Sequence, residues 1–259
     1  MSKYQFTDTD LAARRLEYLA EVYGPSSRSF IRHFSDRTVG RAIDLGCGPG
    51  FTTEMLRDET DARSTVGLDN SERFIAICKT RELDQISFYQ HDVTSEPFPA
   101  GPYEIAYCRF LLSHLPDISG CLEVWGCQLA PNGLLLIEEV ETIHTTVGEF
   151  EEYLQIVDQL LAHQSAHLYV GPVLDGSVPS DTLRKVSNRV QSVSVSVQDA
   201  ATMFHMNIQS WRQQPYVCEN YRAEMIQGLQ DRLASLASGG GSGGEIRWGL
   251  RQMVLCRVG

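Results

Sequence analysis

The sequence predicts an α/β fold built on an open, doubly wound and mostly parallel sheet. Between residues 40 and 140, short apolar strands alternate with helical patterns, and strands that are apolar throughout are typical of parallel sheets covered on both faces. The first of these strands runs into a glycine-rich loop, Gly46–Gly50, which a helix follows. In such sheets, ligands bind at the carboxyl ends of the strands, where the strand order reverses.

The composition fits one globular domain. The chain has 259 residues, of which 42% are hydrophobic and 21% charged, and a chain of this size can bury a sizeable core without staples. Its seven cysteines are scattered and form no C-x-x-C pair. We therefore expect neither a disulfide framework nor a zinc ribbon.

The charge excludes several partners. Lys and Arg number 22 against 33 Asp and Glu, which gives a net charge of −11 with no basic cluster, and nucleic-acid binding requires basic patches. The first twenty residues are too charged for a secretory signal, and no apolar run reaches the ~18 residues of a membrane span. We expect a cytoplasmic protein without nucleic-acid or membrane partners, and the composition defines no oligomeric state.

The N-terminal segment predicts two helices. Thr7 and Asp10 are typical of a helix start, and apolar residues follow at helical spacing as far as Tyr23. Gly24-Pro25 should end this helix, and a second short helix should cover Ser27–Phe34.

The segment from 40 to 140 carries the parallel sheet and its helices. Expected strands are 42–45, 64–68, 86–90, 104–108 and 134–140, and expected helices are 52–57, 71–82 and 117–128.

The remainder of the chain is more helical. Apolar stripes at 150–161 and 218–236 predict two helices, and the alternation at Val190–Val197 predicts a half-exposed strand. The Gly/Ser run 238–244 is predicted as a surface loop that leads into a last strand around Leu250–Cys256, and an engineered linker is the alternative.

Acidic residues mark three successive strand ends. Asp44 stands just before the glycine loop, Asp69 follows the second strand 19 residues after Gly50, and Asp92 follows the third. An acid at the position of Asp69 is where a ribose diol is held. This edge of the sheet therefore has three acids and no basic residue for phosphate.

At this point the sequence resembles the class I S-adenosylmethionine-dependent methyltransferases. The resemblance covers about 40–140 in order, together with a plausible final antiparallel strand at 247–258. It is carried by the runs 42–50 (AIDLGCGPG), 67–71 (GLDNS), 91–93 (HDV), 103–117 and 129–138. Asn70 departs from it, because many relatives have an apolar or aromatic residue there.

The resemblance implies a Rossmann-like, seven-stranded sheet with an antiparallel C-terminal strand and added helices that form a lid. We expect a single methyltransferase domain, 1–259, with an N-terminal helical lid (1–36), a cofactor-binding half (40–140) and substrate-side helices with the last strands (141–259). The lid helices are expected at 1–36, 149–167 and 199–236.

The resemblance also assigns the cofactor, S-adenosyl-L-methionine, and its contacts. The loop would lie against the methionine part, Asp69 would accept the ribose hydroxyls, Asp92 would accept the adenine amino group beside Val93, and Arg109 would lie near the carboxylate. The expected cofactor-binding residues are Asp44, Gly46, Cys47, Gly48, Gly50, Asp69, Asn70, Asp92, Val93 and Arg109.

A general base is needed only when the acceptor atom keeps a proton of high pKa, because holding the acceptor in line supplies most of the catalysis. The candidate catalytic residues are His144 and His114, with Glu139 and Glu141 as further candidates in the same region. Each has a structural alternative: His114 as a packed helix end, the acids as a solvated loop.

No metal site is expected. His163 and His167 have the four-residue spacing of metal ligands on a helix, but no third ligand is evident. Apolar residues of the C-terminal part could line an acceptor pocket, although a plain core role is the alternative. These are Tyr153, Tyr169, Met203, Phe204, Met206 and Trp211.

The expected function is transfer of a methyl group to O, N or C of a small organic molecule, such as a metabolite or secondary product. One alternative is a homologue that binds the cofactor but cyclises or rearranges its substrate. Another is a protein methyltransferase or interaction module. Turnover of the cofactor separates these hypotheses.

Overall fold

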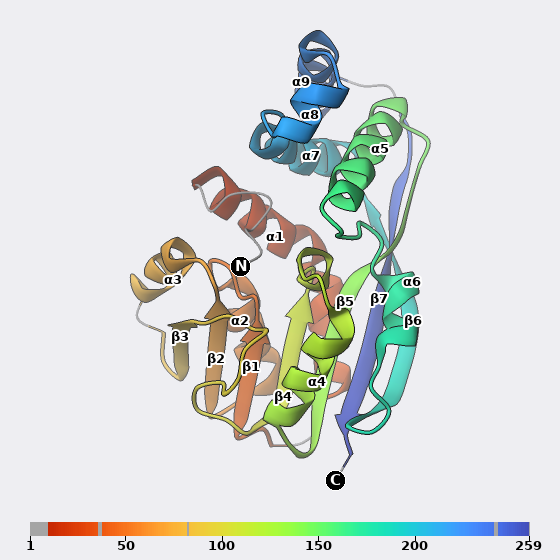
Figure 1. The fold of residues 1–259 in the computed structure, drawn as a ribbon. Coiled ribbons are helices and arrows are strands. Elements are labelled where there is room, and N and C mark those ends of the chain that lie inside the picture. The colour runs from red at the N-terminus through yellow and green to blue at the C-terminus, as the bar shows by residue number, and fades with distance from the viewer. Residues whose placement is uncertain (1–9, 36–37, 82, 241–242, 259) are drawn as a thin grey trace.

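The computed structural model describes residues 10–35, 38–81, 83–240 and 243–258, and their centre is one mixed sheet in the order β3-β2-β1-β4-β5-β7-β6 (Figure 1). The strands are β1 (Arg41–Leu45), β2 (Ser64–Asp69), β3 (Ile86–Gln90), β4 (Tyr103–Arg109), β5 (Leu129–Thr145), β6 (Leu183–Val195) and β7 (Ile246–Arg257). The helices are α1 (Asp10–His33), α2 (Phe51–Thr60), α3 (Glu72–Lys79), α4 (Ile118–Gln128), α5 (Gly148–His163), α6 (Gly171–Leu174), α7 (Val197–Trp211), α8 (Pro215–Asn220) and α9 (Ala223–Ala237).

The strand pairing confirms the predicted fold class. The strands β1 to β5 pair in parallel, and β7 lies antiparallel between β5 and β6. Four of the five residues of β1 are buried, as are the four central residues of β2, which explains why the sequence shows apolar runs there instead of alternation. The strand order reverses between β1 and β4, so their carboxyl ends flank the predicted ligand site.

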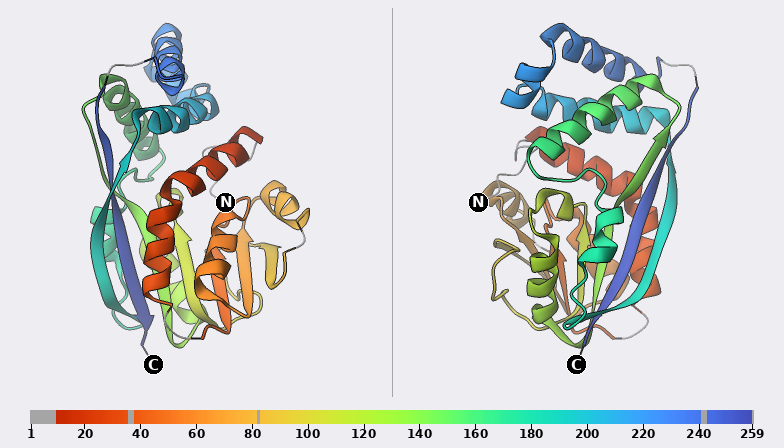
Figure 2. Two further views of the ribbon diagram at one scale, coloured as in Figure 1. Left: turned by 180° about the vertical axis from the view of Figure 1, so that it is seen from behind. Right: turned by 45° about the vertical axis from the view of Figure 1, so that its right-hand side comes forward.

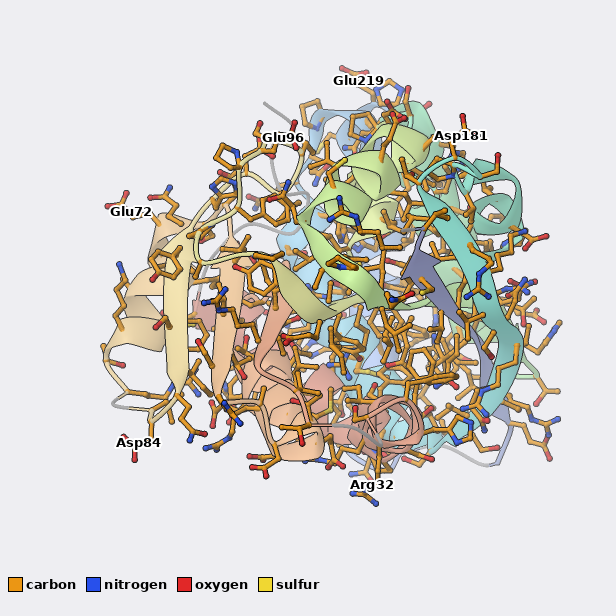
Figure 3. The ribbon with its side chains drawn as sticks, turned by 90° about the horizontal axis from the view of Figure 1, so that it is seen from below. Arg32, Glu72, Asp84, Glu96, Asp181 and Glu219 are labelled. Carbon is orange, nitrogen blue, oxygen red and sulfur yellow. The ribbon has the colours of Figure 1, made fainter. Side chains whose placement is uncertain are left out.

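Helices cover both faces of the sheet. Seen along the sheet, α4 lies on one face and α1 with α2 on the other (Figure 3). Between α1, α2 and the sheet lies a buried cluster that includes Phe30, Met55, Tyr107 and Leu136. The labelled charged residues of Figure 3, such as Glu72 and Asp84, lie on the rim of the molecule and point outward.

The first helix differs from its prediction. The break expected at Gly24-Pro25 is wrong: α1 continues from Asp10 to His33 with Pro25 inside it, while Thr7 lies outside the described residues. Proline inside a helix removes one hydrogen bond and bends the axis, and the helix bends partway along its length (Figure 2). Burial of Tyr23, Ser27 and Phe30 offsets the lost bond.

A second layer of helices stands above the carboxyl ends of the parallel strands (Figure 1). The helices α5, α7 and α9 bury a common core that includes Phe150, Leu160, Ile208 and Leu229. The N-terminal half of α1 packs against α7, where the Tyr18 hydroxyl donates to Asp199 Oδ1 over 2.5 Å. Helices therefore cover the edge where the resemblance places the lid, and the division of the chain into three parts stays a prediction.

Three other elements differ in length from their predictions. The fifth strand runs to Thr145, five residues beyond the predicted end, because it pairs with β7 along this whole stretch apart from one register shift. The expected strand at 190–197 begins earlier, at Leu183, and gives way to α7 at Val197. The stripe at 218–236 is divided between α8 and α9, with a break at Tyr221.

The loop after α9 leads into β7 as predicted, with residues 241–242 outside the described part. No helix among the described residues is long and apolar enough to cross a membrane.

We expect Phe30→Ala to lower the free energy of unfolding by about 3–5 kcal/mol, the usual cost of removing a large side chain from a core. Phe30 is fully buried under the sheet. Val190→Ala is the control, because Val190 is 48% exposed on the edge strand and should change stability by less than about 0.5 kcal/mol. Urea unfolding measures both, and a Phe30 variant as stable as the control would contradict the packing.

Candidate functional site

A cavity of about 940 Å³ lies between the carboxyl ends of the strands and the second layer of helices. This volume is at the upper end of the range for small-molecule sites, so it has room for a cofactor and a second molecule. Its floor includes Gly46–Pro49, Asp69–Ser71, His91–Thr94 and Arg109–Leu111, and its upper wall includes residues of α1, α5, α7 and β7.

The glycine loop opens the cavity floor. Gly46 and Gly48 have φ angles of +69° and +52°, a backbone conformation that side chains disfavour. A Cβ at Gly46 would lie 2.7 Å from the Leu111 side chain, and one at Gly48 would lie 3.2 Å from Leu16. The two glycines therefore leave the loop without side chains at the points where Leu111 and Leu16 lie against it.

Asp69 joins the loop to the next helix. Its Oδ2 accepts from the Gly48 amide and its Oδ1 from the Ser71 amide, both over 2.8 Å. Ser71 in turn caps α3. The carboxylate lines the cavity, and a carboxylate oxygen can accept more than one hydrogen bond.

The third strand end presents a second carboxylate. Asp92 Oδ1 accepts from the hydroxyl and the amide of Thr94, and these hydrogen bonds lower the pKa of Asp92. Its neighbour Val93 is buried, and the Val93 carbonyl accepts from the Trp125 indole over 2.8 Å. An exposed acceptor thus stands beside a fixed apolar side chain at the cavity edge.

Arg109 brings a positive charge to the centre of the site. Its guanidinium donates to Ser27 Oγ of α1 over 3.0 Å and lies 5.7 Å from the centre of the Phe110 ring. Among the described residues it forms no ion pair. A ligand carboxylate could therefore meet this guanidinium in the cavity.

Asp44 lies beneath the loop instead of in the cavity. It is 1% exposed, and its Oδ2 accepts from the hydroxyls of Thr52 and Thr53 at the start of α2. Burial raises its pKa to about 6, against the lowering effect of the two threonines. Its position indicates that it fixes the helix after the loop.

The cavity brings together most of the predicted cofactor-binding residues. It is lined by Gly46, Cys47, Gly48, Asp69, Asn70, Asp92, Val93 and Arg109, and it is not lined by Asp44 or Gly50. Gly50 lies on the far side of the loop, where an added Cβ would meet Arg81 at 2.8 Å.

The two predicted catalytic histidines have different positions. His144 is exposed on β5, opposite Arg247 of β7, and does not line the cavity. The structure therefore does not bring it to the predicted ligand. His114 is the last residue of a short 3-10 helix, Leu112–His114, and lines the cavity. Burial, with a smaller contribution from the nearby Arg15 charge, lowers its pKa to about 4.

For Glu139 and Glu141, the alternative of a solvated loop is wrong, because both residues lie in β5. Glu141 forms a two-bond ion pair with Arg251, at 2.7 and 2.8 Å. Glu139 is 1% exposed and lines the cavity. Its Oε1 accepts from the amides of Leu111 and Leu112, and burial raises its pKa to about 8. Of the candidate bases named from the sequence, Glu139 therefore lines the cavity and His144 does not.

Sequence reasoning missed two arginines. Arg81 contacts the glycine loop from outside the cavity. It donates to Glu54 and to the Pro49 carbonyl, and its guanidinium lies 5.5 Å from the Phe51 ring centre. Arg15 lines the cavity and is 8% exposed. The sequence could have shown this, because Arg15 lies four residues before Leu19 in a helical pattern and so shares its apolar face.

Three of the six residues predicted as an acceptor pocket or core line the cavity, and their role as an acceptor pocket stays a prediction. Tyr153, Met203 and Phe204 line the cavity, whereas Tyr169, Met206 and Trp211 do not. Trp211 is fully buried in the core of the helical layer.

The two spaced histidines do not share a helix, because α5 ends at His163 and His167 lies beyond it. The His163 ring stacks on Tyr216 at 4.5 Å. In the described ranges, no three His, Cys, Asp or Glu side chains are grouped to hold a metal.

Comparison with known proteins agrees with this geometry. Residues 42–133 match the family model described as a methyltransferase domain. The matched segment, the fold and the acid-rich cavity agree with the resemblance to the class I S-adenosylmethionine-dependent methyltransferases.

Particular relatives are trans-aconitate 2-methyltransferases. The chain is 36% identical to that of Variovorax paradoxus over 101 residues, which are 39% of this chain and 38% of that protein. It is 35% identical to that of Methylobacterium nodulans over 127 residues, 49% of this chain and 48% of that protein. The match covers less than half the length of these relatives.

Solved structures share the fold over most of the chain. A Bacillus halodurans protein assigned as a methyltransferase has a TM-score of 0.61 at 14% identity, covering 89% of this chain and 98% of that one. The cyclase SpnF has a TM-score of 0.57 at 16% identity, covering 90% of this chain and 81% of its own. At these identities the likeness shows the fold alone.

We expect Glu139→Gln to change how stability depends on pH. The folded-state pKa of Glu139 is about 8, above the ordinary 4.5, so its contribution is full below pH 4.5 and is lost as pH rises through 8. Glutamine keeps an acceptor for the two amides and carries no charge. Since one pKa unit corresponds to about 1.4 kcal/mol, the variant should gain about 2–4 kcal/mol relative to the wild type between pH 5 and pH 9.

Urea unfolding at the two pH values measures this difference. Glu123→Gln, at an exposed position of α4, is the matched control. Parallel stability curves for the wild type and the Glu139 variant would contradict a buried, proton-binding carboxyl.

Proposed function

We propose that the protein transfers the methyl group of S-adenosylmethionine to O, N or C of a small organic molecule. One observation carries the proposal: a single cavity joins the methyltransferase loop and its acids to an apolar chamber under the second helical layer. Ligand sites of this kind combine apolar walls with a few placed polar groups.

The residues present fit the cofactor. S-adenosylmethionine carries a sulfonium, an ammonium and a carboxylate but no phosphate, and the cavity floor offers the carboxylates of Asp69 and Asp92 with the guanidinium of Arg109. Asp69 would accept the ribose hydroxyls and Asp92 the adenine amino group beside Val93. The open surface at Gly46 and Gly48 would receive the methionine part.

When bound, the cofactor supplies a methyl carbon activated by its sulfonium. The helical layer would hold the acceptor atom in line with that carbon, and this positioning supplies most of the rate. The apolar walls exclude water from the chamber. If the acceptor atom carries a proton, the ionised form of Glu139 is the cavity group best suited to receive it, because a pKa of about 8 makes this carboxylate a stronger base than an ordinary one.

The two histidines are weaker candidates for the base. His114 has a pKa of about 4 and would bind a proton only weakly at neutral pH, so we propose it as a neutral hydrogen-bonding wall of the chamber. His144 lies outside the cavity and has no role in this proposal.

The direct test is calorimetric titration with S-adenosylmethionine and with its demethylated product S-adenosylhomocysteine, followed by transfer of labelled methyl to candidate acceptors. Trans-aconitate, for which the relatives are named, belongs in this screen. Binding with transfer supports the proposal. Binding of both cofactor forms without methyl loss, while a substrate is rearranged, would favour the cyclising alternative, and no binding would overturn the proposal.

We expect Asp69→Ala to weaken S-adenosylhomocysteine binding at least 100-fold. The variant loses the ribose acceptor and also the two hydrogen bonds that position Gly48 and Ser71. Asp69→Asn keeps one acceptor oxygen and should lose less. Asp158→Ala, at an exposed position of α5, is the control; calorimetry with circular dichroism as a fold check would contradict the assignment if Asp69→Ala bound like the control.

A further inference from the structure

The upper chamber of the cavity has walls of one chemical kind. Its apolar wall residues come from α1, α5, α7, β5, β7 and the segments after β4 and α5. They are Leu16, Leu19, Ala20, Tyr23, Phe110, Val140, Ile143, Tyr153, Leu154, Val157, Leu161, Leu168, Met203, Phe204 and Trp248. A molecule bound here would exchange water for hydrocarbon and ring surfaces over most of its area.

The rings of this chamber form a continuous aromatic wall. Tyr153 stacks on Phe204 at 4.1 Å with an interplanar angle of 18°, and Phe204 lies 5.9 Å from Trp248. Trp248 meets Tyr23 edge to face at 5.8 Å, and Tyr23 meets Phe110 in the same way at 5.2 Å. These ring–ring contacts fix flat surfaces against which another ring can stack or pack edge to face.

The charge in the chamber is sparse. Of the described residues that line the whole cavity, the arginines are Arg15 and Arg109, and Arg109 belongs to the cofactor end. Glu139 is a buried carboxyl on the floor. One guanidinium cannot compensate several carboxylates removed from water, and an uncompensated buried charge is costly. The chamber therefore disfavours a polycarboxylate.

One polar pair interrupts the apolar wall. The Asn207 Nδ2 donates to the Tyr153 hydroxyl over 2.8 Å. The other amide atom, Oδ1, is buried and has no hydrogen-bond partner among the described residues, although the side chain lines the cavity. An unsatisfied buried acceptor costs free energy that a ligand donor can recover.

We propose that the methyl acceptor is a planar, apolar ring compound with at most one negative charge, which packs on the Phe204–Trp248 wall and donates one hydrogen bond to Asn207. This inference rests on the proposed function and names its substrate class. The ring compound occupies the chamber, and its O–H or N–H group meets the buried amide oxygen of Asn207.

The test compares two probes on protein saturated with S-adenosylhomocysteine. Calorimetry with 2-naphthol should show binding at least tenfold tighter than with tricarballylate, a flexible molecule with three carboxylates. Equal binding of the two, or tighter binding of tricarballylate, overturns the inference while the proposed function stands. Failure of S-adenosylhomocysteine itself to bind overturns the proposed function and the inference with it.

A matched pair of variants on α7 locates the binding. Met203 lines the cavity and Met206, one turn away, does not. Met203→Trp should fill the chamber and weaken 2-naphthol at least tenfold without changing the affinity for S-adenosylhomocysteine. Met206→Trp should leave both affinities unchanged, and equal effects of the two variants on 2-naphthol would overturn the inferred location.

A third variant tests the proposed hydrogen bond to Asn207. Asn207→Leu should weaken 2-naphthol several-fold and leave its methyl ether, which has no donor, unaffected. Loss of both ligands in equal measure would show that the amide serves packing alone and would overturn the hydrogen bond in the proposal.

Discussion

The hydrogen bonds of Asp69 are the constraint on which the rest of the site depends. One carboxylate binds the Gly48 amide of the first loop and the Ser71 amide at the start of α3, so it joins the carboxyl ends of β1 and β2 into one surface. The loop takes its path because Gly46 and Gly48 can adopt positive φ angles. Arg81 holds the same loop from outside through the Pro49 carbonyl. A rigid floor results, and a ligand meets groups already in position.

Buried carboxyl groups farther inside the sheet also hold neighbouring segments in place through hydrogen bonds. The carboxylate of Asp44 binds two threonine hydroxyls of α2, and Glu138 accepts from Tyr107 over 2.6 Å and from Gln252 over 2.7 Å. Glu139 accepts two amides of the segment after β4. Each of these carboxyl groups is buried away from water, and each takes two hydrogen bonds in return, as buried polar groups require. The strand ends therefore position the loops through side chains as well as through the sheet.

The sequence predicts the sheet well and the long-range contacts poorly. The apolar runs of β1, β2 and β4 are visible because parallel strands are buried on both faces, and the acids at the ends of β2 and β3, Asp69 and Asp92, mark the floor. The extension of β5 to Thr145 depends on pairing with β7, which begins about a hundred residues later, so no local pattern showed that Glu141 and His144 continue the strand of Glu139 and that His144 lies outside the cavity. The continuity of α1 through Pro25 likewise depends on burial against the sheet.

The helix α1 explains why the floor and the upper chamber form one site. Its second half buries Phe30 against the sheet, and Ser27 receives a hydrogen bond from Arg109 at the floor. Its first half contributes Arg15, Leu16 and Leu19 to the cavity wall and reaches α7 through Tyr18. One bent helix thus spans both layers, and Pro25 lies between the two parts. A change in this bend would move the wall of the chamber relative to the floor, so the path of α1 couples the two layers of the site.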